Sequence, residues 1–86
     1  MNQIIIDVRE PFEFSMGHVD GALNIPPSVI MDGLPGELEN VAKDTLLVHY
    51  CRSGARSGAS MQFLKRYGFT NMVNGINKDH VQNKYI

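Results

Sequence analysis

The stretch TLLVHYCRSGARSGASMQFLKRYG, residues 45–68, decides the fold that this sequence predicts. Its first six residues are mostly apolar or β-branched, which is typical of a strand buried on both faces of a sheet. Within residues 57–67, Ala59, Phe63 and Tyr67 lie at a spacing of four, which predicts a helix that ends at Gly68. The only cysteine of the chain, Cys51, therefore lies at the carboxyl end of a strand, just before a short glycine-containing loop.

The rest of the chain continues the alternation of strands and helices. Short apolar runs predict three more strands, over residues 4–8, 22–25 and 71–74. This order predicts an α/β fold with a small, mainly parallel sheet of about four strands flanked by helices. In such sheets, functional sites form beyond the carboxyl ends of the strands, which is where Cys51 falls.

Two further helices are expected between these strands. Pro11 is suited to the first turn of a helix, and a short helix through Met16 follows. Within residues 28–44, apolar side chains at 34, 38 and 41 predict one short amphipathic helix. The tail over residues 77–86 is polar with weak periodicity, and no element is predicted there. The four phenylalanines are expected to pack in or against the core.

Size and composition exclude several classes of protein. The chain has 86 residues, and we expect residues 1–86 to form a single domain. One cysteine excludes an internal disulfide, and a net charge of -1 gives no reason to expect nucleic acid or a membrane as a partner. The first residues lack the pattern of a signal peptide. We therefore expect a cytoplasmic protein, or a periplasmic one if a leader has been removed.

The loop after the cysteine combines charge, hydroxyl groups and a flexible backbone. Its residues are Arg52, Ser53, Gly54, Ala55, Arg56 and Ser57. The arginine charges and the N-terminus of the following helix are both devices that lower the pKa of a thiol. Glycine and alanine allow successive backbone N–H groups to converge on an anion. We therefore predict a reactive thiolate at Cys51 in a cradle for an anionic substrate; the alternative is an inert buried cysteine.

The sequence offers no partners for a general base or a metal beside this loop. An ionised thiol needs no general base, and none is evident apart from His49, which we interpret as a structural residue of the strand. Three histidines, at positions 18, 49 and 80, and one cysteine have no recognisable zinc spacing. No metal and no cofactor are therefore expected. Asp7 and Arg9 are interpreted as a bonded pair that fixes a loop, and His18 as a residue that holds a turn.

The cysteine loop resembles the active-site loop of the rhodanese (thiosulfate sulfurtransferase) family. A second, separate segment carries the same resemblance: DVREP at residues 7–11, then Gly17-His18-Val19, and Gly21 through Pro26. Residues 68–71 are also similar to the family's stretch after the active-site helix, so that the resemblance covers most of residues 4–75. It implies a rhodanese-like three-layer domain of the short type, without the usual first strand and helix.

The resemblance also implies an activity. Cys51 would take sulfane sulfur from thiosulfate, or from a related persulfide or polysulfide, and hold it as a persulfide. The sulfur would then pass to cyanide in vitro, or to a thiol or a sulfur-relay protein in cells, with the loop residues binding the anionic donor. Where the family commonly has a glycine pair followed by tryptophan, this chain has Asn74-Gly75-Ile76 and no tryptophan.

Three alternatives to a thiosulfate sulfurtransferase stay open at this point. A non-enzymatic sulfur carrier or relay module would use the same loop, and the small size of the chain favours it. A cysteine-dependent phosphatase would need a longer loop, because such enzymes place five residues between cysteine and arginine, whereas four separate Cys51 from Arg56. A degenerate regulatory domain is disfavoured by the intact cysteine and arginines.

Overall fold

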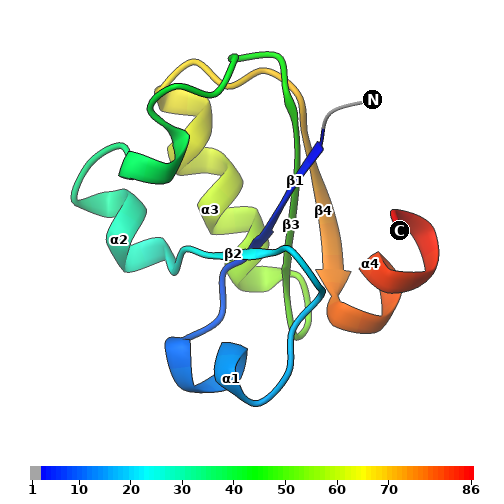
Figure 1. The fold of residues 1–86 in the computed structure, drawn as a ribbon. Helices are drawn as coiled ribbons and strands as arrows, with labels where there is room; N and C mark the ends of the chain where they lie inside the picture. The colour runs from blue at the N-terminus through cyan, green and yellow to red at the C-terminus, as the bar shows by residue number, and fades with distance from the viewer. Residues whose placement is uncertain (1–2) are drawn as a thin grey trace.

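The computed structural model describes residues 3–86, which form a four-stranded sheet with helices packed around it (Figure 1). The strands are β1 (Gln3–Asp7), β2 (Leu23–Asn24), β3 (Leu46–Cys51) and β4 (Met72–Asn77), in the order β2-β1-β3-β4. Each pair of neighbouring strands is parallel. The predicted α/β fold with a mainly parallel sheet of about four strands is therefore confirmed.

The helices cover both faces of this sheet and the end at which its strands finish. They are α1 (Pro11–Ser15), α2 (Pro27–Met31), α3 (Ala55–Arg66) and α4 (Lys78–Lys84), with a short 3-10 helix, η1 (Gly36–Leu38). Figure 1 shows α2 and α3 on one face, α4 on the other, and α1 beyond the carboxyl end of β1. Within residues 3–86, no helix is long and apolar enough to cross a membrane.

Alternation along β3 divides the buried side chains into two clusters. Leu47 and Cys51 face α2 and α3, whereas Val48 and Tyr50 face the opposite side of the sheet. The first cluster holds Ile6, Val8, Ile25, Ile30, Leu38, Leu47, Cys51, Leu64 and Phe69. The second holds Ile5, Val19, Ala22, Val48, Tyr50 and Val81. Because both faces of β3 are covered, its sequence is almost continuously apolar, and the cysteine at its end is held in a rigid frame.

The prediction of one short amphipathic helix within residues 28–44 is wrong. The structure has α2 earlier, over Pro27–Met31, and only the 3-10 turn η1 over Gly36–Leu38. Gly33 has a φ of 146°, outside the helical region, and Pro35 disfavours helical backbone at the residue before it. The apolar spacing instead belongs to a loop whose Leu38 is fully buried in the first cluster.

The polar tail forms a helix that the sequence analysis did not predict. Asn77 caps α4, because its side-chain oxygen accepts a hydrogen bond from the backbone N–H of His80 at 2.8 Å. Val81 is fully buried in the second cluster, and Tyr85 packs against it. The signal was present in the sequence as an asparagine followed by an acidic residue in the first turn, but one buried valine gives little periodicity.

Candidate functional site

Cys51 ends β3, and its thiol points toward the loop that leads into α3. The residue is only 2% exposed, and it is the free cysteine of the chain. The backbone N–H of Gly54 donates a hydrogen bond to the sulfur at 3.0 Å. This contact closes a turn of three residues around Sγ, so that backbone donors rather than a charged side chain meet the sulfur first.

The surroundings of Cys51 favour the thiolate. Burial opposes ionisation and raises the pKa of the thiol, but hydrogen bonding from the Ser57 hydroxyl and from the backbone of Ser57, Ser53 and Gly54 outweighs it. The net effect lowers the pKa of Cys51 from 9.0 to about 7. In the structure, the buried Ser57 Oγ meets no partner in favourable hydrogen-bond geometry among the described residues, so its hydroxyl is free to turn toward the sulfur.

The helix begins earlier than predicted, and this changes the role of the loop residues. α3 starts at Ala55 rather than near Ser57, with Gly54 as its N-cap at a φ of 94°. Such a positive φ is readily adopted only by glycine. Ala55, Arg56 and Ser57 are therefore the first turn of a helix, whose unpaired N–H groups and dipole favour an anion at the position of the sulfur. Only Arg52, Ser53 and Gly54 form the loop itself.

The two arginines of the predicted cradle have different environments. Arg52 is exposed and has no ion pair among the described residues. Arg56 donates to both carboxylate oxygens of Glu13, at 2.7 and 3.2 Å. This bond lowers the pKa of Glu13 to about 2, together with the bond from the backbone N–H of Glu10, and it raises the pKa of Arg56. Of the two causes expected from the sequence, the hydrogen bonds rather than the arginine charges dominate the lowering of the thiol pKa.

Glu13 is a residue of the candidate site that was not predicted from the sequence. It lies on α1, and its carboxylate also accepts a hydrogen bond from the backbone N–H of Glu10 at 2.9 Å, which fixes it at the start of that helix. The available signal was a glutamate three residues after the N-cap position, which is the spacing of a capping box. That signal predicts a helix start, but it does not predict a partner 43 residues away in sequence.

A buried polar network fixes the loop between β1 and α1 beside the site. Asp7 is fully buried and accepts from Arg9 Nη2 at 2.7 Å and from the Tyr50 hydroxyl at 2.8 Å. Arg9 Nη2 also donates to the Gly17 carbonyl at 2.7 Å. Burial raises the pKa of Tyr50 to about 12, so its hydroxyl remains a donor. The geometry supports the interpretation that Asp7 and Arg9 hold a loop in place. The negative charge of Asp7 is balanced by the positive charge of Arg9.

Among residues 3–86, no histidine forms a hydrogen bond with the thiol. His18 is exposed, donates from Nδ1 to the Phe14 carbonyl at 2.8 Å and stacks on the Phe14 ring, which holds the turn after α1. His49 is fully buried in β3, and its Nδ1 pairs with the Ser60 hydroxyl at 3.1 Å. Burial lowers the pKa of His49 to about 4, so this ring is neutral. Both histidines thus serve the fold, as the sequence analysis interpreted them.

A shallow pocket lies next to the cysteine loop. It has a volume of about 380 Å³ and is lined by Arg9, Phe12, Glu13, Met16 and Arg52. Phe12 is 67% exposed and Met16 is 84% exposed. The expectation that all four phenylalanines pack in or against the core is therefore wrong for Phe12, because α1 buries none of its residues fully. The mouth of the site thus combines one free guanidinium with an apolar rim.

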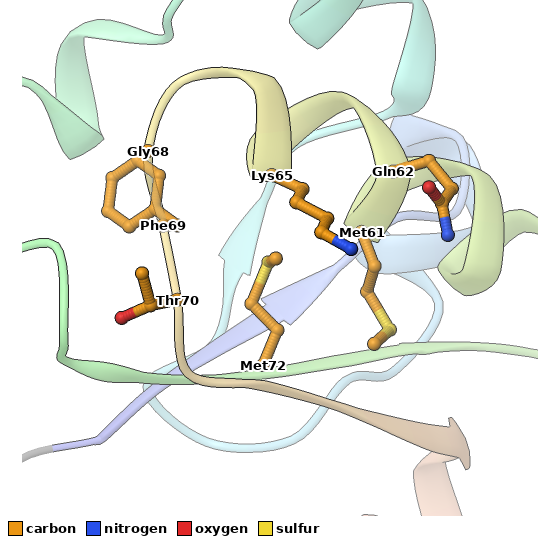
Figure 2. Close-up of a pocket in the computed structure, with 7 residues that line it drawn as sticks. All are labelled: Met61, Gln62, Lys65, Gly68, Phe69, Thr70 and Met72. Carbon is orange, nitrogen blue, oxygen red and sulfur yellow. The ribbon is translucent and has the colours of Figure 1, made fainter.

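A second hollow, of about 560 Å³, lies at the other end of α3, remote from the cysteine loop. Figure 2 shows its lining, in which Lys65, Met61 and Met72 come from α3 and β4, and Gly68, Phe69 and Thr70 from the turn between them. It contains none of the predicted site residues, so its size does not make it the reactive site. Among residues 3–86, no group of three or more His, Cys, Asp or Glu side chains is arranged to hold a metal ion.

Comparisons with known proteins agree with this geometry. A family model described as "Rhodanese-like domain" matches residues 1–78. The chain is 39% identical over 69 residues to the probable adenylyltransferase/sulfurtransferase MoeZ of Mycobacterium tuberculosis, an alignment that covers 80% of this chain and 17% of that protein. It is 34% identical over 71 residues to a sulfurtransferase of Allochromatium vinosum, covering 83% of this chain and 63% of that protein. The chain thus spans less than two thirds of each relative.

The fold comparison gives the same result. A solved structure of a rhodanese with anions from E. coli superposes with a TM-score of 0.76 at 29% sequence identity. The superposition covers 91% of this chain and 89% of that one.

Proposed function

The chain belongs to the rhodanese-like domain family, and from this premise we propose that it is a sulfurtransferase that carries sulfane sulfur as a persulfide on Cys51. The observation that supports this most directly is the hydrogen bond from the Gly54 N–H to Sγ at 3.0 Å, at the N-terminus of α3. A terminal persulfide sulfur is an anion, and the turn offers it the same backbone donors that favour the thiolate.

The loading step needs no proton transfer. The Cys51 thiolate attacks the outer sulfur of thiosulfate, a new S–S bond forms, and the bond between the outer sulfur and the sulfonyl sulfur breaks. The electron pair of the broken bond leaves with sulfite. One negative charge remains on the outer sulfur, now bound to Sγ. Because the pKa of Cys51 is about 7, a large share of the thiol is ionised at neutral pH without a general base.

The unloading step returns the enzyme to its first state. A nucleophile attacks the outer sulfur of the persulfide, and the electron pair of the S–S bond returns to Sγ as the thiolate. Cyanide becomes thiocyanate in this step, and a thiol becomes a persulfide. This two-step scheme is ping-pong, with the modified cysteine as its intermediate.

Electrostatics at the mouth decide how well a dianionic donor binds. Arg52 is free to attract it, but the charge of Arg56 is compensated by Glu13 at 2.7 Å. A thiosulfate ion must therefore compete with Glu13 for Arg56 with both of its charges, whereas the reacting end of a persulfide or polysulfide carries one negative charge and competes less. Our proposal covers thiosulfate and these related donors, with the second group better matched to the local charge.

A sulfur carrier or relay module is the second candidate. The exposed Phe12 and Met16 beside Arg52 favour it, because an apolar rim next to a free cation suits the surface of a protein or a large donor better than a small ion. A cysteine-dependent phosphatase is not favoured. Its arginine would have to bind a phosphate ester, and Arg56 is already bonded to both oxygens of Glu13.

Steady-state kinetics with matched donors test the proposal. Thiocyanate formation from cyanide is measured with thiosulfate, inorganic polysulfide and glutathione persulfide, using the wild type and Cys51→Ser. After the uncatalysed reaction of cyanide with each donor is subtracted, we expect parallel reciprocal plots, turnover that requires Cys51, and a higher kcat/KM for the persulfide donors. Equal turnover in Cys51→Ser contradicts the proposal. Loading by persulfide donors with negligible thiosulfate turnover selects the carrier.

A further inference from the structure

The side chain of Asn74 connects the edge strand β4 to the turn that surrounds Cys51. Asn74 is partly buried, and its Nδ2 donates a hydrogen bond to the carbonyl of Gly54 at 2.9 Å. Gly54 is the residue whose N–H donates to Cys51 Sγ at 3.0 Å. The Asn74 amide, on another strand, thus binds the carbonyl of the peptide group between Gly54 and Ala55. This group directly follows the peptide group whose N–H meets the sulfur.

The orientation of the Asn74 amide is fixed by its own strand. Its Oδ1 accepts a hydrogen bond from the backbone N–H of Ile76 at 3.0 Å, so the amide nitrogen must point the other way, toward Gly54. This local bond comes from an irregularity in β4. His49 pairs with Asn74 and Tyr50 pairs with Ile76, which leaves Gly75 as an extra residue. Bulges of this kind redirect a side chain next to a functional site.

The bulge has visible costs, which support a role beyond the sheet itself. Ile76 has a φ of 72°, a conformation that strains a β-branched residue by roughly 1–2 kcal/mol. Gly75 has no room for a side chain, because an added Cβ would lie 2.4 Å from Val81 Cγ2 and 3.1 Å from the His49 carbonyl oxygen. Strained backbone of this kind persists only where the surrounding contacts require it.

Gly54 receives two donors on one carbonyl. The Gly58 N–H bonds to it at 3.0 Å as the first turn of α3, and Asn74 Nδ2 completes the second lone pair. The approach is close: a Cβ on Gly54 would lie 3.4 Å from Asn74 Nδ2. With its carbonyl held on the helix side and its φ at 94°, Gly54 has little freedom to rotate its own N–H away from the sulfur.

We propose that Asn74 is a positioning residue, which fixes Gly54 so that its N–H stays directed at Cys51 Sγ and at the sulfur that Cys51 carries. Asn74 does not touch the sulfur and acts only through Gly54. The importance of this residue for sulfur transfer rests on the proposed function. Its effect on the thiolate does not, because that depends only on the contact between Gly54 and Sγ.

The test removes the donor in three ways and uses a neighbouring asparagine as control. Asn74→Ala removes the amide, whereas Asn74→Ser keeps a neutral oxygen that can accept from the Ile76 N–H and is too short to donate to Gly54. Asn74→Asp also loses the donor but adds a negative charge, which is why the charge-matched Asn71→Asp is needed beside it. Asn71→Ala and Asn71→Asp make the first and last of these changes just before the amino end of β4, where the exposed Asn71 amide bonds to the Asp44 carbonyl at 3.2 Å. Each protein is alkylated with iodoacetamide from pH 5 to 10, below its thermal midpoint.

We expect the Asn74 variants to shift the alkylation profile of Cys51 upward by about one pH unit, toward the ordinary range of a free thiol. A one-unit shift corresponds to a rate about tenfold lower than that of the wild type at pH 6, with the two rates converging above pH 9. The Asn71 variants should retain the wild-type profile. A purely structural role would lower the rate without this dependence on pH.

Unshifted profiles in the neutral Asn74 variants overturn the proposal, as does an equal shift in the Asn71 variants. If Asn74→Ala does not fold, the neutral Asn74→Ser decides the result, because it keeps an acceptor for the Ile76 N–H and adds no charge near the sulfur. Persulfide formation by the wild type is measured separately. Its absence there would count against the proposed function, while a shifted alkylation profile would still support the positioning role of Asn74.

Discussion

At the scale of single residues, the reactivity of Cys51 depends on a few hydrogen bonds. Burial alone would raise its pKa, yet donors from Ser57, Ser53 and Gly54 bring the pKa to about 7. The thiolate is therefore the main form above about pH 7, and it disappears as the pH falls below that value. Acidification from pH 8 to pH 6 should lower the alkylation rate about tenfold.

Ser57→Ala removes the buried hydroxyl that is free to turn toward the sulfur. We expect the pKa of Cys51 to rise, since the Ser57 hydroxyl heads the contributions that lower it. The measurement is the pH dependence of alkylation, or of thiolate absorbance. Ser60→Ala is the matched control, because Ser60 is another fully buried serine of α3 but bonds to His49. A shift of equal size in both variants would contradict the assignment.

At the scale of elements, the short helix α1 sets the charge of the site. It brings Glu13 onto Arg56, so that the exposed Arg52 is the cation left free at the mouth. The same helix leaves Phe12 and Met16 exposed beside the loop. One five-residue helix thus controls both the electrostatic and the apolar character of the entrance.

Glu13→Gln should improve the use of thiosulfate. Removing the carboxylate frees the charge of Arg56 for a dianionic donor, so we expect KM for thiosulfate to fall several-fold, and the salt dependence of kcat/KM to increase. Glu37→Gln, at an exposed position of η1, is the control for net charge. A higher KM in Glu13→Gln would mean instead that Glu13 is needed to orient Arg56.

The join between β4 and α4 is another place where an element serves the site. Gly75→Ala should destabilise the domain by roughly 1–3 kcal/mol, because the new methyl group collides with Val81 and with the backbone of His49. Denaturant unfolding measures this change. Gly36→Ala is the control, since a Cβ there meets nothing within 4 Å. A neutral Gly75→Ala would show that α4 is not packed tightly on the bulge.

The elements differ in how far the sequence predicts them. The β3–loop–α3 segment is predictable because strand, glycine and helix signals are local and agree with one another. The contact between Glu13 and Arg56 is not predictable, since a surface glutamate on a short helix has no pattern that identifies a distant partner. The bulge at Gly75 and the helix α4 are not predictable either. They are stabilised by the tertiary packing of Val81 against Gly75 and Val48, which no local pattern indicates.

At the scale of the whole molecule, the parallel sheet explains why the site lies where it does. The parallel strands β1 and β3 end at Asp7 and Cys51, so their carboxyl ends lie at the same end of the sheet. Cys51 also pairs with Asn77 at the end of β4. The bulge that directs Asn74 therefore lies only a few residues from this same end of the sheet. Residues 3–86 thereby gather their reactive groups at one end of a small core.

The position of Cys51 in this frame was predictable from the order of strands and helices, and so was a lowered thiol pKa, but the balance of its causes was not. The carboxyl end of a parallel strand is a place where sites form in many α/β proteins. The sequence suggested that Arg52 and Arg56 would stabilise the thiolate. In the structure, hydrogen bonds supply most of that stabilisation, because Arg56 is engaged with Glu13 and the sulfur is buried among backbone donors.

The most direct test of the central claim is intact-protein mass spectrometry of the reduced, desalted chain after brief exposure to thiosulfate and, in parallel, to glutathione persulfide, with Cys51→Ser treated identically. We predict that the wild type gains the mass of one sulfur atom with at least one donor, that cyanide removes this mass, and that Cys51→Ser gains nothing. A wild type that gains no sulfur from either donor, or a Cys51→Ser variant that gains as much, would contradict sulfur transfer through a persulfide on Cys51.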